Sequence, residues 1–393
     1  MSVNNLSIED ARTLLNDLHT QVTGVTGITP TTTADFISMA QATLAAGTDK
    51  VWNALQIQLA RTLFSVRPYT RKFTGLLADD LRWGGIVQKV SYLDSNLSTA
   101  EAVYHPIDGQ SIDQWIQKKG DILVARFTGS DAYQDWITIY DSALREAFLS
   151  ESQLGAFYAA KMTELSNKWE QYIEELNRMA LSNFIAAKIG GETDYPEGVV
   201  HLLTEFNAQT GLSLTAQSVY DPANIRGFFQ WVRARINTLS RRMTNRSELY
   251  QFKVNGKTPN RHTPLANQKI YLLADALDII DTMVNTNTYH DEPLAYADVE
   301  GVDYWQAIEN PDQISLTPAT INAAGQAVTG SAVTQSNVFG AIFDEDAVVT
   351  NVSEERLEST PLNARGLYRN TWLTARRQYC NDLTEKGIIL LLD

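Results

Sequence analysis

One long helix, preceded by a long irregular excursion, limits what this chain can fold into. The helix is predicted from about Leu154 to Lys188, where apolar and aromatic side chains recur at spacings of four, three, four and three residues: Leu165, Trp169, Tyr172, Leu176 and Met179. This spacing places them on one stripe of a helix. At ~1.5 Å per residue the helix is about 50 Å long, which is longer than an ordinary compact domain needs. We expect the stripe to be packed, either in a core or against a neighbouring subunit.

The segment from about Trp83 to Thr128 is predicted to be an extended hairpin arm. Alternating residues predict one strand at Ile86 to Tyr92 and a returning strand at Asp121 to Phe127. The polar stretch between them, residues 94–120, is unusually long for a hairpin loop, and loops of that length are usually functional. An arm next to a long helix suggests a subunit that overlaps its neighbours.

The rest of the chain alternates between helical and strand-like patterns. A Thr/Gly/Pro-rich stretch, Thr23 to Ala34, is typical of an extended, loosely held segment. Helices are predicted over Ile8–Leu18, Asp49–Phe64, Asp131–Phe148, Asp221–Arg242 and Ala274–Val284. Strands are predicted over Phe64–Leu76, Lys269–Leu273, Phe343–Val349, Arg365–Tyr379 and Gly387–Leu392, with loop or edge structure over Ser315–Val338.

Charge is segregated within the second half of the chain. Between Arg226 and Arg261 there are nine Lys and Arg residues and one acid, Glu248, so the local charge is nine minus one, or +8. Residues 270–355 contain fifteen Asp and Glu residues and no Lys or Arg. A basic part and an acidic part of one lobe suit head-to-tail contacts around an axis. The candidate residues for these contacts are Arg226, Arg233, Arg235, Arg241, Arg242, Asp291, Glu292 and Asp303.

The chain shows no recognisable catalytic, cofactor-binding or metal-binding motif. It has no phosphate-binding loop, dinucleotide-binding turn, zinc helix or cysteine pair. His290-Asp291-Glu292 is interpreted as an exposed acidic loop, because three adjacent residues rarely face one ion. Asp275, Asp278 and Asp281 share a helix face that is interpreted as solvated or matched to arginines, and Cys380 is interpreted as structural although nearby arginines would lower its pKa. We therefore expect that the protein is not an enzyme and that it binds no cofactor.

Composition places the chain among ordinary globular proteins of a reducing compartment. Its net charge of −14 argues against a surface that binds nucleic acid as a whole. The single cysteine excludes an internal disulfide framework, and the polar N-terminus lacks the pattern of a secretory signal. No apolar run is long enough to span a membrane, so we expect no membrane partner.

The order of these segments resembles the major capsid proteins of tailed bacteriophages, the Hong Kong 97-type fold that encapsulins share. Trp83 to Thr128 is similar to the extended loop of that fold, and Leu154 to Lys188 to its spine helix. Two strings, -AIFDEDAVV- from Ala341 and -ARGLYRNTWLTARRQYC- from Ala364, resemble the closing strands. The similarity in organisation is greatest to the compact major head proteins of short-tailed phages.

The resemblance implies an α+β fold with a peripheral and an axial domain. Its expected division is an N-terminal arm (1–50), a first peripheral part (51–82), the extended loop (83–128), a peripheral part with the spine helix (129–190), an axial domain (191–340) and the closing strands (341–393). It also implies that the loop lies over a neighbouring subunit. The candidate loop residues for that contact are Tyr104, Trp115, Lys118 and Lys119.

The expected function is that of a structural protein without catalytic residues. The resemblance implies a subunit that self-assembles into hexamers and pentamers of an icosahedral phage head around double-stranded DNA, with portal and scaffolding or decoration proteins as partners. The subunit would assemble in the host cytoplasm and reside in the virion. Two alternatives remain at this point: a non-viral encapsulin-like shell protein, and a nucleic-acid-binding protein that uses Arg226 to Arg261.

Overall fold

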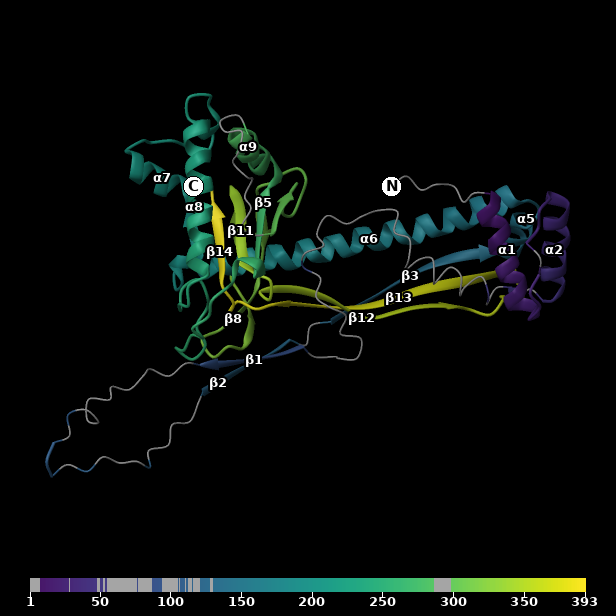
Figure 1. The fold of residues 1–393 in the computed structure, drawn as a ribbon, viewed down its shortest axis with the longest axis horizontal. Helices are drawn as coiled ribbons and strands as arrows, with labels where there is room; N and C mark the ends of the chain where they lie inside the picture. Colours follow the sequence, from purple (N-terminus) through teal and green to yellow (C-terminus); the bar gives the residue numbers. More distant parts are fainter. Residues whose placement is uncertain are drawn as a thin grey trace.

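A single long helix, α6 (Glu151–Gly190), connects the two ends of an elongated molecule (Figure 1). The computed structural model describes residues 8–27, 29–47, 50–51, 54, 76, 87–93, 105, 107–109, 111, 115, 121–127, 130–285 and 298–393. The Ser150 side chain caps the helix by accepting a hydrogen bond from the Gln153 amide at 3.3 Å. With 40 residues the helix is about 60 Å long. The predicted long helix is confirmed, with a few more residues at each end.

At one end, α6 lies along a three-stranded antiparallel sheet (Figure 1). Its strands, in order, are β12 (Val348–Ser359), β13 (Tyr368–Asn381) and β3 (Ser130–Tyr140). Helices α1 (Ile8–Thr23), α2 (Thr33–Ala45) and α5 (Asp141–Ala147) complete this end. Their side chains share one core with the sheet and α6, including Leu15, Phe36, Ile137, Trp169 and Leu373.

Two predictions at this end are wrong. Ser130–Tyr140 is a strand rather than the first half of a helix, because its residues alternate: Ile137 and Ile139 are buried, whereas Trp136 and Tyr140 are exposed. In addition, α2 was not predicted. The Thr/Gly/Pro-rich stretch provides only the connection that precedes it, and Thr32 caps α2 by accepting a hydrogen bond from the Asp35 amide.

At the other end, a five-stranded mixed sheet has helices on both faces. Its order is β4 (Val199–His201), β14 (Gly387–Leu391), β11 (Val338–Asp344), β5 (Gln268–Leu273) and β6 (Asp298–Val302). Ile389 and Leu391 face the end of α6, whereas Ile388 and Leu390 face α7 (Leu202–Thr210), α8 (Ile225–Met243) and α9 (Ala274–Asn285). Burial of both faces explains the uninterrupted apolar run of β14.

The remaining elements are short. Strand β7 (Ile314–Leu316) pairs with β10 (Val333–Gln335), and β8 (Ala319–Ile321) pairs with β9 (Ala327–Thr329), which agrees with the predicted edge structure. Single turns of 3-10 helix occur at Pro196–Gly198, Ser218–Tyr220 and Leu265–Asn267. The predicted strand Phe343–Val349 is wrong, because a turn at 345–347 separates β11 from β12 and these strands belong to different sheets.

A two-stranded ribbon extends away from the body (Figure 1). It consists of β1 (Val87–Leu93) and β2 (Asp121–Phe127), paired antiparallel from Val87 opposite Phe127 to Leu93 opposite Asp121. Both predicted arm strands are thereby confirmed. The predicted helix Asp49–Phe64 and strand Phe64–Leu76 lie almost entirely outside the described residues. Within the described part of the chain, no helix is both long and apolar enough to cross a membrane.

Candidate functional site

The β1–β2 ribbon exposes apolar side chains on one of its two faces. Ile122 and Val124 on β2 are 55% and 45% exposed, and Val90 on β1, which pairs with Val124, is 50% exposed. Successive strand residues point to opposite faces, and the alternate residues Leu123 and Ala125 are less exposed. A two-stranded ribbon with an uncovered apolar face is not stable alone in water, so this face is a candidate contact surface.

The loop carried by the ribbon is described at only a few positions. Among the predicted contact residues, Trp115 is 81% exposed, and Ile107 in the same loop is 63% exposed. Large exposed apolar side chains of this kind are typical of interaction sites. The other predicted contact residues, Tyr104, Lys118 and Lys119, lie outside the described residues.

The predicted stripe of α6 is only partly buried. Trp169 and Leu176 are 9% and 3% exposed, and Tyr172 is half-buried with its ring centroid 3.8 Å from that of Tyr133. Met179 is 47% exposed, so it does not pack in the core of the subunit, and its contact with a neighbouring subunit stays a prediction. The helical placement of Leu165 is confirmed, but its side chain lies outside the described residues.

The exposure of Met179 has a simple geometrical cause. At about 100° per residue, Met179 falls on the helix surface beside the exposed Lys168 and Glu175. The buried face is centred nearly half a turn away and includes Ile173 and Leu181. Polar residues on this face obscure the apolar pattern. They are Glu170, Glu174 and Asn177, all buried where α6 passes the sheet.

Part of the segregated charge is paired within the subunit. Arg235 on α8 and Glu205 on α7 form a bidentate ion pair, with Nε–Oε2 and Nη2–Oε1 distances of 2.6 and 2.7 Å. Burial and the nearby Asp278 raise the pKa of Asp281 on α9, whereas Arg233 on α8 acts in the opposite direction. These contacts are predicted between subunits, but the basic α8 and the acidic α9 already pack together in one chain.

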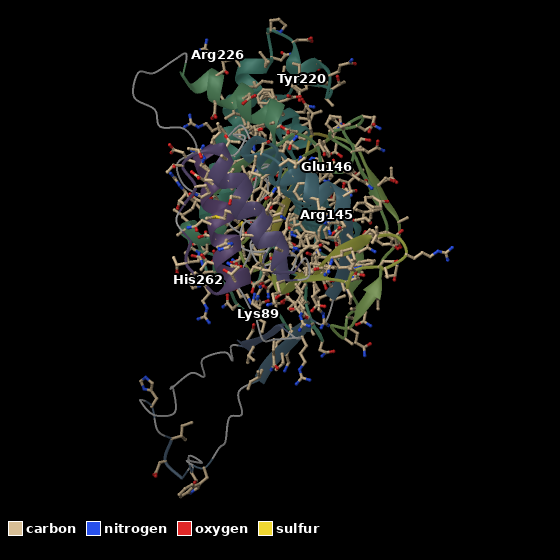
Figure 2. The ribbon with its side chains drawn as sticks, turned by 90° about the vertical axis from the view of Figure 1, so that its right-hand side faces the viewer. Lys89, Arg145, Glu146, Tyr220, Arg226 and His262 are labelled. Carbon is tan, nitrogen blue, oxygen red and sulfur yellow. The ribbon has the colours of Figure 1, made fainter. Side chains whose placement is uncertain are left out.

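Other candidate charges lie on the surface of this lobe. Arg226 lies in the first turn of α8, on the side of the molecule away from the ribbon (Figure 2), and Arg241 and Arg242 lie in its last turn. All three side chains are exposed, as is Asp303 after β6. Cations in the last turn of a helix are stabilised by the helix dipole, which favours Arg241 and Arg242 at this position. Asp291 and Glu292 lie outside the described residues.

The alternatives involving reactive groups gain no support from the described residues. Burial and the neighbouring Asp382 raise the pKa of Cys380 to about 11, so the expectation that arginines lower it is wrong. A thiol with a raised pKa is unreactive at neutral pH. In the described ranges, no three His, Cys, Asp or Glu side chains gather as metal ligands, although His290-Asp291-Glu292 lies outside those ranges.

Two buried lysines that the sequence does not predict connect separate segments around the five-stranded sheet. Lys188 near the end of α6 donates hydrogen bonds to the carbonyl oxygens of Tyr250, Leu383 and Glu385, and burial lowers its pKa to about 7. Lys386 donates to the Asn245 carbonyl and the Ser247 hydroxyl, and burial lowers its pKa to about 8. Neither residue stands in a recognisable motif, and no local signal identifies them.

Comparisons with known proteins place these surfaces in context. A family model described as Phi29-like phage major capsid protein matches residues 15–390. A chain from the capsid structure of Staphylococcus phage Andhra has a TM-score of 0.55 and 10% identity, covering 84% of this chain and 86% of that one. A chain from the structure of head fiber and inner core protein gp22 of native bacteriophage P68 has a TM-score of 0.53 and 9% identity, with the same coverage.

These structural similarities confirm the Hong Kong 97-type fold over most of the chain. At identities of about one in ten they establish the fold alone. No curated protein sequence matches the chain.

Proposed function

Because the chain belongs to the Phi29-like phage major capsid protein family, and is therefore a structural subunit of a tailed-phage head, we propose that it assembles into hexamers and pentamers by laying its ribbon over a neighbouring copy. The family match covers nearly the whole chain and decides for a phage capsid over a non-viral shell. It also confirms the expectation of a structural protein rather than an enzyme.

The observation that carries the proposed contact is the exposed apolar face of the ribbon. Val90, Ile122 and Val124 lie on one side of a ribbon that extends away from the body (Figure 1). Burial of apolar surface contributes roughly 25 cal/mol per Å², and a second copy is the partner that a self-assembling subunit always has. We further propose that the exposed loop residue Trp115 enters the same contact.

The domain division expected from the sequence provides the framework for this proposal. In it, the lobe with α7, α8 and α9 is the axial domain around the centre of each capsomer. The end with α1, α2, α5 and the three-stranded sheet is the peripheral domain. The separation of the two ends along α6 supports this division (Figure 1). Portal, scaffolding or decoration proteins are the further partners that we propose, with DNA enclosed but not tightly bound.

The exposed arginines of α8 are proposed to contact acidic residues of the next subunit around the capsomer axis. Replacement of Arg241 and Arg242 by Glu is expected to prevent capsomers and particles from forming, even without nucleic acid. Each exposed pair contributes only about 0–1 kcal/mol, but a ring repeats the contact at every interface. Negative-stain electron microscopy and sedimentation of purified protein measure the outcome.

A matched control separates this contact from a general effect of charge. Lys50 and Arg365 are exposed residues near the opposite end of α6, and their replacement by Glu changes the net charge equally. This control is expected to leave capsomers intact. If the Arg241/Arg242 variant assembles normally and only its binding to DNA or RNA falls, the lobe is a nucleic-acid face and the proposed axial contact is wrong.

A further inference from the structure

The inner face of the ribbon combines polar residues of β1 with the apolar residues Leu123 and Ala125 of β2. Lys89 and Ser91 are two residues apart on β1, so they share the face opposite Val90. Figure 2 shows Lys89 at the base of the ribbon, next to the body. The ribbon therefore exposes Val90, Ile122 and Val124, whereas the ammonium group of Lys89 is directed to the body.

Lys89 contacts carboxylates from two separate parts of the chain. Its Nζ atom forms an ion pair with Oε1 of Glu385 and lies 3.5 Å from Oδ2 of both Asp382 and Asp346. The Lys89 side chain is 23% exposed, whereas those of Asp382 and Glu385 are 3% and 7% exposed. Asp346 is 65% exposed, so solvent reaches the group from that side.

Arg261 provides a second connection to the same carboxylate. Its guanidinium forms an ion pair with Glu385 and donates a hydrogen bond to the Ser91 hydroxyl of β1. We call the group Lys89, Arg261, Asp346, Asp382 and Glu385 the base cluster. It contains two cations and three carboxylates, of which Asp382 and Glu385 are buried, so the loss of either cation raises the excess of negative charge from one to two.

The carboxylates of the base cluster are held in place from the body side. Asp382 accepts hydrogen bonds from the Thr384 amide at 2.9 Å and its hydroxyl at 2.6 Å. Lys188 of α6 donates to the carbonyl oxygens of Leu383 and Glu385, both at 3.3 Å. The turn that carries Asp382 and Glu385 is thus fixed to the long helix, and the ribbon is attached to that turn.

Solvent has access to the base cluster. An open cleft of about 520 Å³ adjoins it, lined in part by Arg261, His262, Asp346 and Glu385. Water and salt ions in this cleft can screen the ion pairs from one side. The attachment of the ribbon is therefore expected to weaken as ionic strength rises, because the Debye length falls from about 10 Å at 0.1 M to about 3 Å at 1 M.

We propose that the base cluster is an electrostatic latch that fixes the direction and the roll of the ribbon, so that its apolar face points outward before any neighbour is bound. The seven residue pairs of the ribbon cannot hold its angle to the body, because they connect the two strands only to each other. With the latch closed, the contact surface is preorganised, which lowers the entropic cost of association. Only this consequence for assembly rests on the proposed function.

The latch is tested by hydrogen exchange of wild-type protein kept below its assembly concentration. In Lys89→Gln, the backbone amides of β1 and β2 are expected to exchange about tenfold faster, since the ribbon loses its attachment and opens more often. In wild-type protein, raising NaCl from 0.1 to 1 M is expected to accelerate the same amides. In Lys89→Gln this response to salt should be smaller, because only the connection through Arg261 remains, while Lys89→Arg should preserve both slow exchange and the salt response.

Lys168→Gln is the matched control, because it removes the same charge from an exposed ion pair with Asp135 on the body. It should leave ribbon exchange unchanged, and the amides of α8 and β13 should exchange as in wild type in every variant. Equal ribbon exchange in Lys89→Gln and wild type would overturn the latch. Ribbon exchange in wild-type protein that does not change with salt would also overturn the latch. This measurement does not depend on whether Lys89→Gln folds. Neither readout requires shells to form, so failure of the latch is distinguishable from failure of the proposed assembly.

Discussion

Deletion of Asn96 to Ile116 is expected to give a folded subunit that no longer builds closed particles. The deletion removes 21 residues between the ribbon strands and leaves six, residues 94–95 and 117–120, to connect Leu93 to Asp121. Six residues suffice to close a hairpin between paired strand ends, so the ribbon should persist. The exposed Trp115 and Ile107, which are candidates for the neighbouring copy, are lost. Electron microscopy and sedimentation measure assembly, and a thermal melt measures folding.

A second variant separates the length of the loop from its chemistry. In it, the same 21 residues are replaced by a Gly/Ser linker of equal length, which keeps the reach of the arm but removes its side chains. We expect this variant to fail as well, because the contact depends on apolar side chains. Normal shells from the deletion would contradict the extended-loop interpretation. Normal shells from the linker variant alone would show that the ribbon, not the loop, makes the contact.

The sequence predicts the long and regular elements best. Helix α6 has periodic apolar residues over many turns, and the ribbon strands alternate clearly, so both were located from sequence. The sequence of β3 predicts a helix wrongly, because a short segment with several apolar residues fits both the period of a helix and that of a strand. The segment is a strand because it pairs with β13, which lies more than 200 residues away in the sequence. A local sequence pattern carries no information about so distant a partner.

The contact residues were predictable only where local spacing determines them. The buried face of α6 was misplaced because Glu170, Glu174 and Asn177 are buried there, and polar residues do not count toward an apolar pattern. The base cluster was not predicted at all. Its members, at residues 89, 261, 346 and 382–385, are far apart in the sequence. They come together only in the folded chain, where three segments of the body meet the base of the ribbon. Charge segregation predicted carboxylate partners for the arginines, but not that Arg235 pairs within its own chain.

Trp169→Ala is expected to lower the free energy of unfolding by about 3–5 kcal/mol, the range for removing a large aromatic side chain from a core. Trp169 is 9% exposed and belongs to the core that joins α6, the three-stranded sheet, α1 and α2. Its ring lies 5.9 Å from that of Tyr172 and 5.5 Å from the Arg377 guanidinium, so the substitution also removes an aromatic contact and a cation–π contact. Urea denaturation of unassembled protein, followed by circular dichroism, measures the change.

Met179→Ala is the matched control, since it shortens a large side chain of the same helix at a position that is 47% exposed. A surface substitution of this kind usually changes stability by no more than about 0.5 kcal/mol. The two variants together test the orientation of α6: a large loss for Trp169 and almost none for Met179 places the packed face as the structure has it. Comparable losses for both would mean that the helix is rotated toward the predicted stripe, and an unchanged midpoint for Trp169→Ala would mean that this face of α6 is not packed in the subunit.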